Sequence, residues 1–355
     1  MSELAAISSL DWRGGGGSPD RDLVLRGASV LDPRAAIDGT YDVVVRSGRI
    51  AELAAPGGAE EGQAEIVDAE GKWVFPAFFD PHVHLRTPGD EDEEDRDLSR
   101  PAGPHDAHLG ATMHEGIVSA ALGVTGVPSV AESSIIARDA SLAAYEDARI
   151  HVQHLSARES VEAVAAAKEA GVRITCEVTP HHLVLTDEEV RTLDARFKMN
   201  PPLRSEDDRQ ALIAGLRSGV IDCVATDHAP HSLDEKEVPF EEAAMGVTGL
   251  ETAFSALHTN LVVTGALDLG VVVERMSAGA TPFGFEPPTL AVGSEATLVL
   301  FDPQIEWEAG ADGWESRSAN SCFAGRPMRG RVLMTVVAGR VTFRQRQFAL
   351  GVAPS

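Results

Sequence analysis

Two histidines separated by one residue could together hold a metal ion. His82 and His84 lie in the segment Asp80 to Arg86, which closes an apolar run that begins at Trp73. Residues two apart on a strand point to the same side, so both imidazoles could bind one ion, and imidazole nitrogen is a common zinc ligand. The alternative for a His-x-His pair is two histidines at the surface or in ordinary packing.

Two further groups of metal-compatible residues stand at the ends of predicted strands. His151 and His154 belong to the apolar run Ile150 to Leu155, and Asp227 follows the run Ile221 to Thr226. The carboxyl ends of parallel strands gather the sites of α/β proteins. We therefore predict that His154, nearest that end, is a ligand and that His151 packs. Asp227 could bind the metal and move a proton during hydrolysis; its alternative is to cap the next helix.

The elements that must position these residues alternate between strand and helix. Three pairs have the spacing of a capping box at a helix start: Ser156 with Glu159, Thr186 with Glu189, and Ser205 with Asp208. Gly171 and Gly219 are the predicted ends of the first and third helices. Such alternation favours a parallel α/β layer, either a barrel or an open sheet.

Both ends of the chain contain short β-type runs instead. Examples are Leu23 to Leu25 near the start and Ala296 to Phe301 and Val332 to Val337 near the end. We predict one composite β-sandwich domain from residues 21–75 and 290–345 and a (β/α) barrel-type catalytic domain from residues 76–289. Residues 1–20, with four consecutive glycines at 14–17, are predicted to be a flexible extension.

Composition narrows the classes of partner. The net charge of −25 repels phosphate backbones and anionic lipid, which argues against nucleic-acid and membrane binding. A small anionic substrate remains compatible, because one local arginine or metal can outweigh a diffuse field. Three widely separated cysteines and the lack of a signal-like start or long apolar run predict a cytoplasmic protein without disulfides.

Several motifs together resemble the bacterial dihydroorotases of the amidohydrolase superfamily. The resemblance runs from about Asp22 to about Phe343 and rests on five segments: His82 to Gly89, Met113 to Gly116, Thr179 to His182, Met199 to Arg204 and Thr226 to His231. Hydantoinases and allantoinases share the metal pattern. They are not expected to share the arginine after the second histidine together with the Asn-Pro-Pro-Leu-Arg run.

The resemblance implies a (β/α)8 barrel with a β domain and zinc-dependent interconversion of L-dihydroorotate and N-carbamoyl-L-aspartate in pyrimidine biosynthesis. By motif match, His82, His84 and Asp227 would hold one zinc and His154 a second. Asp227 would also act as the catalytic base and acid. The substrate would be held by Arg86, Asn200 and His231 and by the loop that contains Met245 and Gly246.

The chain is too short for the whole family pattern. The family places the first histidine pair on strand one and the later histidine on strand six, which calls for roughly 150 residues at about 30 per βα unit. Here His84 and His154 are 70 positions apart. We infer that two or three units are missing at a junction between Asp95 and Leu109. The missing stretch should carry a Met-Pro-Asn-Thr substrate segment, the carboxylate that bridges two zincs, and a His-x-Glu-Asp strand end.

Replacements for the missing ligands could come from the shortened stretch itself. Pro101 stands where the lost histidine is expected, and His105, Asp106 or His108 could substitute for it or belong to a linker without a role. The acidic run Asp90 to Asp97 could offer a carboxylate or be a solvated surface segment.

Three interpretations of the shortened chain follow. It is a hydrolase with one zinc, one open coordination position and a single small-molecule substrate. Alternatively, it is a non-catalytic partner that supports assembly of aspartate transcarbamoylase, as some dihydroorotase-like proteins do. In the third, it is an in-frame deletion that folds poorly. Unpaired strand edges in an open barrel favour homo-oligomers.

Overall fold

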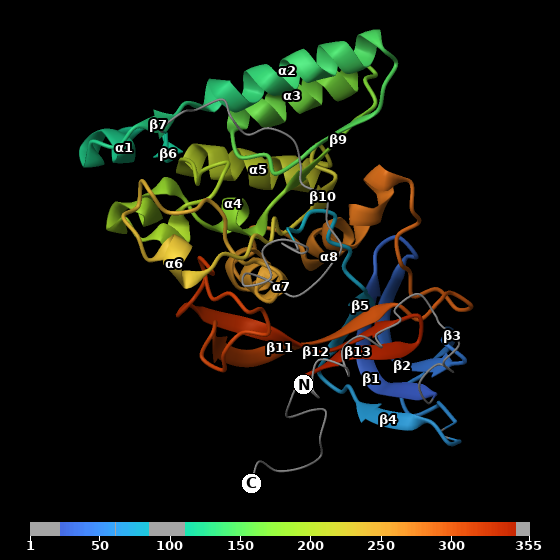
Figure 1. The fold of residues 1–355 in the computed structure, drawn as a ribbon. Helices are drawn as coiled ribbons and strands as arrows, with labels where there is room; N and C mark the ends of the chain where they lie inside the picture. The colour runs from blue at the N-terminus through green and yellow to red at the C-terminus, as the bar shows by residue number, and fades with distance from the viewer. Residues whose placement is uncertain (1–21, 61, 85–110, 346–355) are drawn as a thin grey trace, which may run out of the picture.

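The computed structural model describes residues 22–60, 62–84 and 111–345, which form a β-rich layer and an α/β part (Figure 1). The predicted extension at residues 1–20 and the junction between Asp95 and Leu109 lie outside the described residues.

The β-rich layer is one sheet built from both ends of the described chain. Its strand order is β13-β12-β11-β5-β1-β2-β3, with β4 beside β1. The strands are β1 (Leu23–Asp32), β2 (Ile37–Arg46), β3 (Arg49–Ala54), β4 (Glu65–Asp68), β5 (Trp73–Pro76), β11 (Leu298–Glu308), β12 (Pro327–Val337) and β13 (Arg340–Arg344).

Pairing between β5 and β11 joins the two ends of the sequence. The two strands run antiparallel, with Phe75 opposite Val299 and Val74 opposite Leu300. On one face, side chains such as Leu25, Val45 and Leu300 pack into a common apolar core. The other face of β5 and β11 presents Phe75 and Phe301 to the helices of the α/β part. The segment that leaves β5 toward His82 therefore starts from a fixed position.

The strands of the α/β part are short and parallel. The order is β10-β9-β8, from β8 (Ile150–Val152), β9 (Ile174–Val178) and β10 (Cys223–Val224), and β6 (Met113–His114) pairs with β7 (Gly126–Val127). Two further parallel bridges join Val83 to His228 and His228 to Val247. The His82–His84 segment thus lies next to the loop that follows β10.

Helices cover the outer face of these strands (Figure 1). The α-helices are α1 (Ile117–Leu122), α2 (Ser129–Tyr145), α3 (Arg158–Glu169), α4 (Pro180–Val184), α5 (Glu206–Ser218), α6 (Leu233–Lys236), α7 (Ala253–Leu257) and α8 (Leu269–Ser277). Shorter 3₁₀ segments are η1 (Asp187–Thr192), η2 (Ala195–Phe197) and η4 (Ala278–Phe283), and η3 (His258–Val262) is a π-helical turn.

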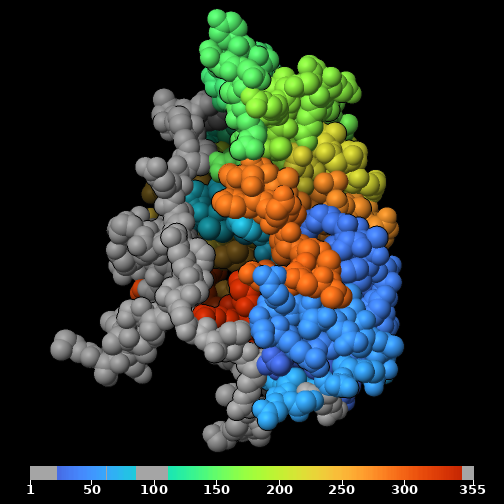
Figure 2. All heavy atoms as spheres, turned by 90° about the vertical axis from the view of Figure 1, so that its right-hand side faces the viewer, coloured from blue at the N-terminus to red at the C-terminus, as the bar shows by residue number. Residues whose placement is uncertain are grey.

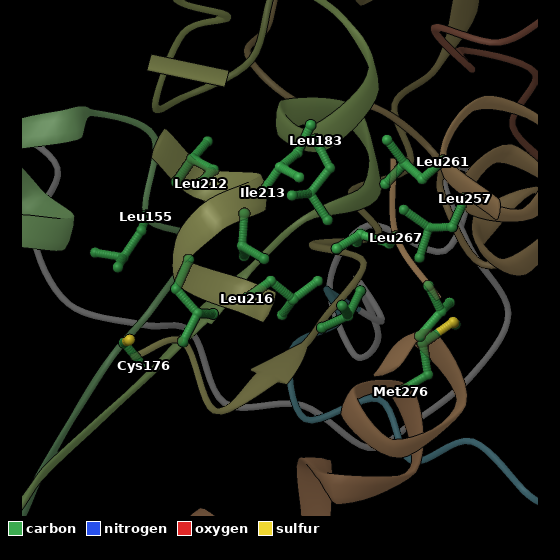
Figure 3. Close-up of a cluster of buried hydrophobic side chains, with 14 of the residues drawn as sticks. Leu155, Cys176, Leu183, Leu212, Ile213, Leu216, Leu257, Leu261, Leu267 and Met276 are labelled. Atoms are coloured by element: carbon green, nitrogen blue, oxygen red, sulfur yellow. The ribbon is translucent and has the colours of Figure 1, made fainter. Parts of the chain in front are cut away.

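The core between strands and helices fixes which way each strand residue faces. Leu212 and Leu216 of α5, Met276 of α8 and Cys176 of β9 all belong to this core (Figure 3). Alternate residues of a strand point to opposite faces. Because Cys176 and Val178 face the helices, Glu177 between them faces the interior of the α/β part.

The three predicted helix starts have different outcomes. Ser205 caps α5 in a capping box with Asp208, and Gly219 ends that helix, as predicted. Thr186 precedes a 3₁₀ segment without a side-chain cap. The prediction for Ser156 is wrong, because α3 begins after Ala157 and the Ser156 hydroxyl contacts the Glu132 carboxylate instead.

In the view from the side, the green end of α2 stands at the top and the blue strands of the sheet lie at the bottom (Figure 2). Within the described ranges, every helix is too short or too polar to traverse a lipid bilayer.

Candidate metal centre

Three predicted ligands converge at one point of the α/β interior. Asp227 Oδ1 lies 3.0 Å from His84 Nε2 and 3.2 Å from His82 Nε2. One ligand atom from each of the three residues lies within 4.8 Å of the others. Two imidazoles and a carboxylate that meet in this way form a donor set suited to a divalent cation such as zinc.

The backbone brings these residues together across a long sequence separation. His84 N donates to His228 O at 2.8 Å, which aligns the His82–His84 segment with the loop after β10. The Asp80 carboxylate accepts from the backbone of both segments, at Thr226 N (3.0 Å) and His82 N (3.2 Å). Burial raises the pKa of Asp80 to about 6, although these hydrogen bonds oppose the rise. Asp80 therefore connects the two sides of the site.

Two of the predicted ligands have strained backbones. Asp227 has φ +48° and His154 has φ +35°, a region that residues other than glycine seldom adopt. Strain of this kind persists only where surrounding structure enforces it and is concentrated at functional sites. Asp227 comes three residues after the end of β10 and His154 two residues after the end of β8, so each lies in the turn that leaves its strand.

His154 lies next to the three-residue group. Its ring centroid is 5.2 Å from that of His82. Burial lowers the pKa of His154, although the charge of Asp227 opposes this change. The lowered pKa favours the neutral imidazole, which is the form that binds metals. The structure therefore places His154 within reach of the site, outside the tight cluster formed by His82, His84 and Asp227.

Glu177 is a member of the site to which the sequence analysis gives no role. Its Oε1 accepts from His82 Nδ1 at 2.7 Å and from His154 N at 3.3 Å, and its Oε2 lies 3.0 Å from His151 Nε2. The available signal was a carboxylate inside the apolar run Val172 to Val178. One buried carboxylate thus orients one predicted ligand and the backbone of another.

His151, predicted to be a packing residue, lies 5.5 Å from Phe283 between ring centroids and also has polar partners. Both ring nitrogens have polar partners, Thr175 Oγ1 at 2.9 Å and Glu177 Oε2 at 3.0 Å. These polar partners could not be predicted from the sequence around His151, because they lie on β9, 24 and 26 positions further along the chain.

The surroundings of His82 fit a bound cation. Because Nδ1 donates to Glu177, the lone pair of Nε2 points to the other side. That buried Nε2 has no hydrogen-bond partner in the described part of the chain, although Asp227 Oδ1 is 3.2 Å away. Burial disfavours a charged ring, but Glu177 and Asp227 raise the pKa of His82. A positive charge between Nε2 and Asp227 Oδ1, from a bound cation or from a proton on the ring, would stabilise this buried pair.

Asp227 is held in its ionised form. Burial acts against ionisation, but the hydrogen bond with His84 and the charges of His154 and His82 lower the pKa of Asp227 far below its usual value. An ionised carboxylate is the state required both for metal binding and for accepting a proton.

Two of the predicted substrate residues, Asn200 and Met245, line cavities. His154 and Asn200 line a cavity of about 560 Å³, and Asn200 and Met245 line a smaller one of about 30 Å³. His231 Nε2 lies 2.9 Å from Met245 O and its Nδ1 lies 3.2 Å from Glu235 Oε2. Arg86 lies outside the described residues, as do the acidic run Asp90 to Asp97 and the histidines at 105 and 108.

Gly246 is required by the packing of its loop. It has φ +135°, and a Cβ added there would lie 2.7 Å from Ala229 Cβ and 3.0 Å from His231 Nε2. Asn320, which the sequence analysis does not identify, donates to Ala229 O at 3.1 Å and to Gly246 O at 3.2 Å. The loop after Asp227 and the Met245–Gly246 loop are thus tied together at close range.

A buried ion pair between Arg204 and Glu132 forms part of the lining of the larger cavity. Arg204 Nε donates to Ser156 Oγ at 2.7 Å, and its Nη2 lies 3.5 Å from Glu132 Oε2. Arg204 also lies 3.2 Å from His114 Nδ1. This network holds α2, the end of β8 and the Asn200–Arg204 segment in fixed positions.

Comparison with known proteins gives one family match and several close sequence relatives. The model of the amidohydrolase family matches residues 111–342. A dihydroorotase of Trichlorobacter lovleyi is 33% identical, in an alignment that covers 92% of this chain and 100% of that relative. A dihydroorotase of Pelobacter propionicus is 34% identical, with 91% and 100% covered. The first alignment runs over 426 positions, more than the 355 residues here, so the relative contains residues without a counterpart in this chain.

Solved structures give the fold. A dihydropyrimidinase from Brevibacillus agri superposes with a TM-score of 0.75 at 20% identity, covering 92% of this chain and 96% of that one. An L-hydantoinase from Arthrobacter aurescens superposes with a TM-score of 0.76 at 22% identity, covering 93% and 98%. The predicted fold class, an α/β barrel-type hydrolase with a β-rich domain, is confirmed.

Proposed function

This chain belongs to the amidohydrolase family and is a hydrolase of cyclic amides, and we propose that it interconverts L-dihydroorotate and N-carbamoyl-L-aspartate in pyrimidine biosynthesis. The observation that carries the proposal is that His82, His84 and Asp227 lie close together in the fold. Asp227 is 143 positions after His84 in the sequence. A small-molecule substrate is consistent with the cavity that adjoins this point.

We assign the metal to His82, His84 and Asp227, with His154 as the nearest additional ligand. The nitrogen and carboxylate donors suit zinc. When bound, zinc would supply an acidified water and polarise the scissile carbonyl. Among the described residues, His82, His84 and Asp227 form one compact set of nitrogen and carboxylate donors, so one ion rather than two is proposed at this catalytic position.

Asp227 is the proposed proton carrier. Its Oδ1 contacts both histidines, so the second carboxylate oxygen is the atom proposed to take up a proton during attack on the ring. The same oxygen would then return the proton to the ring nitrogen that leaves. Asp80 and Glu177 take no proton in this scheme. They are positioning residues that hold Thr226 and His82 in place.

Substrate orientation is assigned to residues around the cavity. Asn200 lines both cavities and would offer its amide to the ring, and Met245 lines the smaller cavity. The backbone of Met245 and the adjacent Gly246 is proposed to contact the ring. His231 would contact the substrate only by exchanging one of its present partners, Glu235 or the carbonyl of Met245. Arg86 is proposed to bind the substrate carboxylate, because a guanidinium recognises a carboxylate through two parallel hydrogen bonds.

The test measures turnover and metal content on the same preparation. Full-length protein is stripped of metal, reloaded with Zn²⁺ and assayed for cyclisation of N-carbamoyl-L-aspartate, with Asp227→Ala as the inactive variant. Activity that depends on zinc and on Asp227 supports the proposal. Tight zinc binding without activity above that of Asp227→Ala would refute it and favour the non-catalytic role beside aspartate transcarbamoylase, which co-purification then examines.

A further inference from the structure

We propose that His151, Glu177 and Cys223 form a second, sulfur-containing site for a thiophilic divalent cation, distinct from the cluster of His82, His84 and Asp227. One ligand atom from each of the three lies within 4.8 Å of the others. In the following, these three residues are called the thiol cluster.

The register of the sheet explains why three strands contribute to one point. In β9 and β10, Glu177 is opposite Cys223, and in β8 and β9, His151 is opposite Thr175. Partners in register point to the same face, and Thr175 and Glu177 are two residues apart on one strand. All three members of the thiol cluster therefore face the interior, while Cys176 faces the helices (Figure 3).

The chemistry of the donors selects the ion. A thiolate, an imidazole and a carboxylate together favour zinc or cadmium over magnesium or calcium, because thiolate sulfur is a soft ligand. Burial raises the pKa of the Cys223 thiol, so that only a thiophilic ion would displace its proton. The released proton goes to solvent. One thiolate, one carboxylate and a neutral imidazole then balance the two positive charges, which a buried site requires.

An entry path leads to the thiol cluster. His151 lines the cavity of about 560 Å³ and is half-buried, whereas Glu177 and Cys223 are fully buried. Tetrahedral zinc with bonds of about 2.0–2.3 Å places its ligand atoms roughly 3.4–3.8 Å apart. The ligand atoms here all lie within 4.8 Å of one another, so each distance would change by about 1 Å or less. Water from the cavity would complete the coordination.

Cadmium absorbance tests the proposal independently of turnover. Metal-free, reduced full-length protein is titrated with Cd²⁺ while ultraviolet charge-transfer absorbance from sulfur to cadmium is recorded. His82, His84 and Asp227 contain no sulfur, so an ion bound there gives no such band. The proposal predicts a band that saturates at one thiolate-bound ion per chain and is absent in Cys223→Ser. His151→Ala should weaken Cd²⁺ binding by at least about tenfold.

Two matched variants serve as controls. Cys176→Ser and Cys322→Ser remove the other two buried thiols and should keep the band. Circular dichroism of Cys223→Ser establishes that loss of the band does not reflect unfolding. A wild-type titration without the band, with all thiols shown to be reduced, would overturn the proposal. So would a band that persists in Cys223→Ser. Failure of the dihydroorotase assay leaves either result unchanged.

Discussion

Replacing Glu177 with glutamine tests how strongly one buried carboxylate sets the metal affinity of the site. The substitution keeps the size of the side chain and removes its charge. His82 Nδ1 lies 2.7 Å from Glu177 Oε1, and the two side chains are only 4% and 1% exposed, so water cannot replace the lost partner. Outer-shell partners of metal-binding histidines contribute about 10- to 100-fold to affinity. We expect the upper part of this range, roughly 30- to 100-fold weaker Zn²⁺ binding or about 2–3 kcal/mol.

The assay is competition for Zn²⁺ against a chromophoric chelator, with all proteins carrying Cys223→Ser so that the thiol cluster does not contribute. Glu169→Gln, on the exposed side of α3, is the control with the same chemical change and should bind Zn²⁺ like wild type. His82→Ala sets the lower limit of affinity. If Glu177→Gln binds Zn²⁺ as tightly as wild type while His82→Ala does not, the carboxylate has no part in orienting His82 and the reasoning is wrong.

Glu177→Gln should also change how the unfolding free energy depends on pH in the acidic range. Burial opposes ionisation, but hydrogen bonds from His151 and His82 lower the pKa of Glu177 to about 2 from 4.5. A carboxyl with a lower pKa in the folded state stabilises the fold above about pH 4.5 and loses this contribution as pH falls toward about 2. In metal-free protein, the difference in unfolding free energy between wild type and Glu177→Gln should therefore narrow over that interval, as measured by urea titration at each pH.

Three other substitutions probe the remaining parts of the site. Asp227→Asn should lower kcat by about 10²- to 10⁴-fold, the usual contribution of a proton-transfer group, with the circular dichroism spectrum unchanged. Gly246→Ala should raise KM and lower stability by about 1–3 kcal/mol, because its Cβ would crowd His231 at a positive φ; thermal melts and steady-state kinetics measure both effects. Asp80→Asn should make the unfolding free energy of the metal-free protein less dependent on pH. The pKa of Asp80 is raised to about 6 from 3.8, so metal-free wild type should lose unfolding free energy relative to the variant as pH rises between those values.

The parts of the fold that depend on neighbours in sequence could be predicted. Ser205 caps α5 because its partner Asp208 is three residues away. Ser156 has the same local pattern, but its hydroxyl contacts Glu132, which lies 24 positions earlier. A tertiary contact replaced the local one, and no pattern within a helix turn contains that information. The same limit applies to His151, whose polar partners lie on another strand.

The candidate site shows the same division between short and long range. His82 and His84 could be found because the period of a strand places them on one side, and Asp227 because it follows a strand. Glu177 and Asp80 could not be assigned roles, since they act on residues 95 and 146 positions away. Their types gave a weak signal, a charged residue inside or beside an apolar run. Knowing which residues they contact requires the register between strands, which the sequence pattern does not contain.

The order of the strands explains how a shortened chain retains a site. Val83 bridges to His228 in the loop after β10, and β10, β9 and β8 follow side by side. His82, His84, Asp227, Glu177 and His154 therefore come from adjacent segments of one continuous arc. Ligands expected from the missing units would have come from elsewhere in the barrel, so we expect their absence to affect a second ion while the first keeps its proposed donors and the orienting carboxylate of Glu177. The zinc content of reloaded Cys223→Ser, which lacks the thiol cluster, decides the matter: one ion per chain agrees with this geometry, and two would mean that residues outside the described ranges complete a second site.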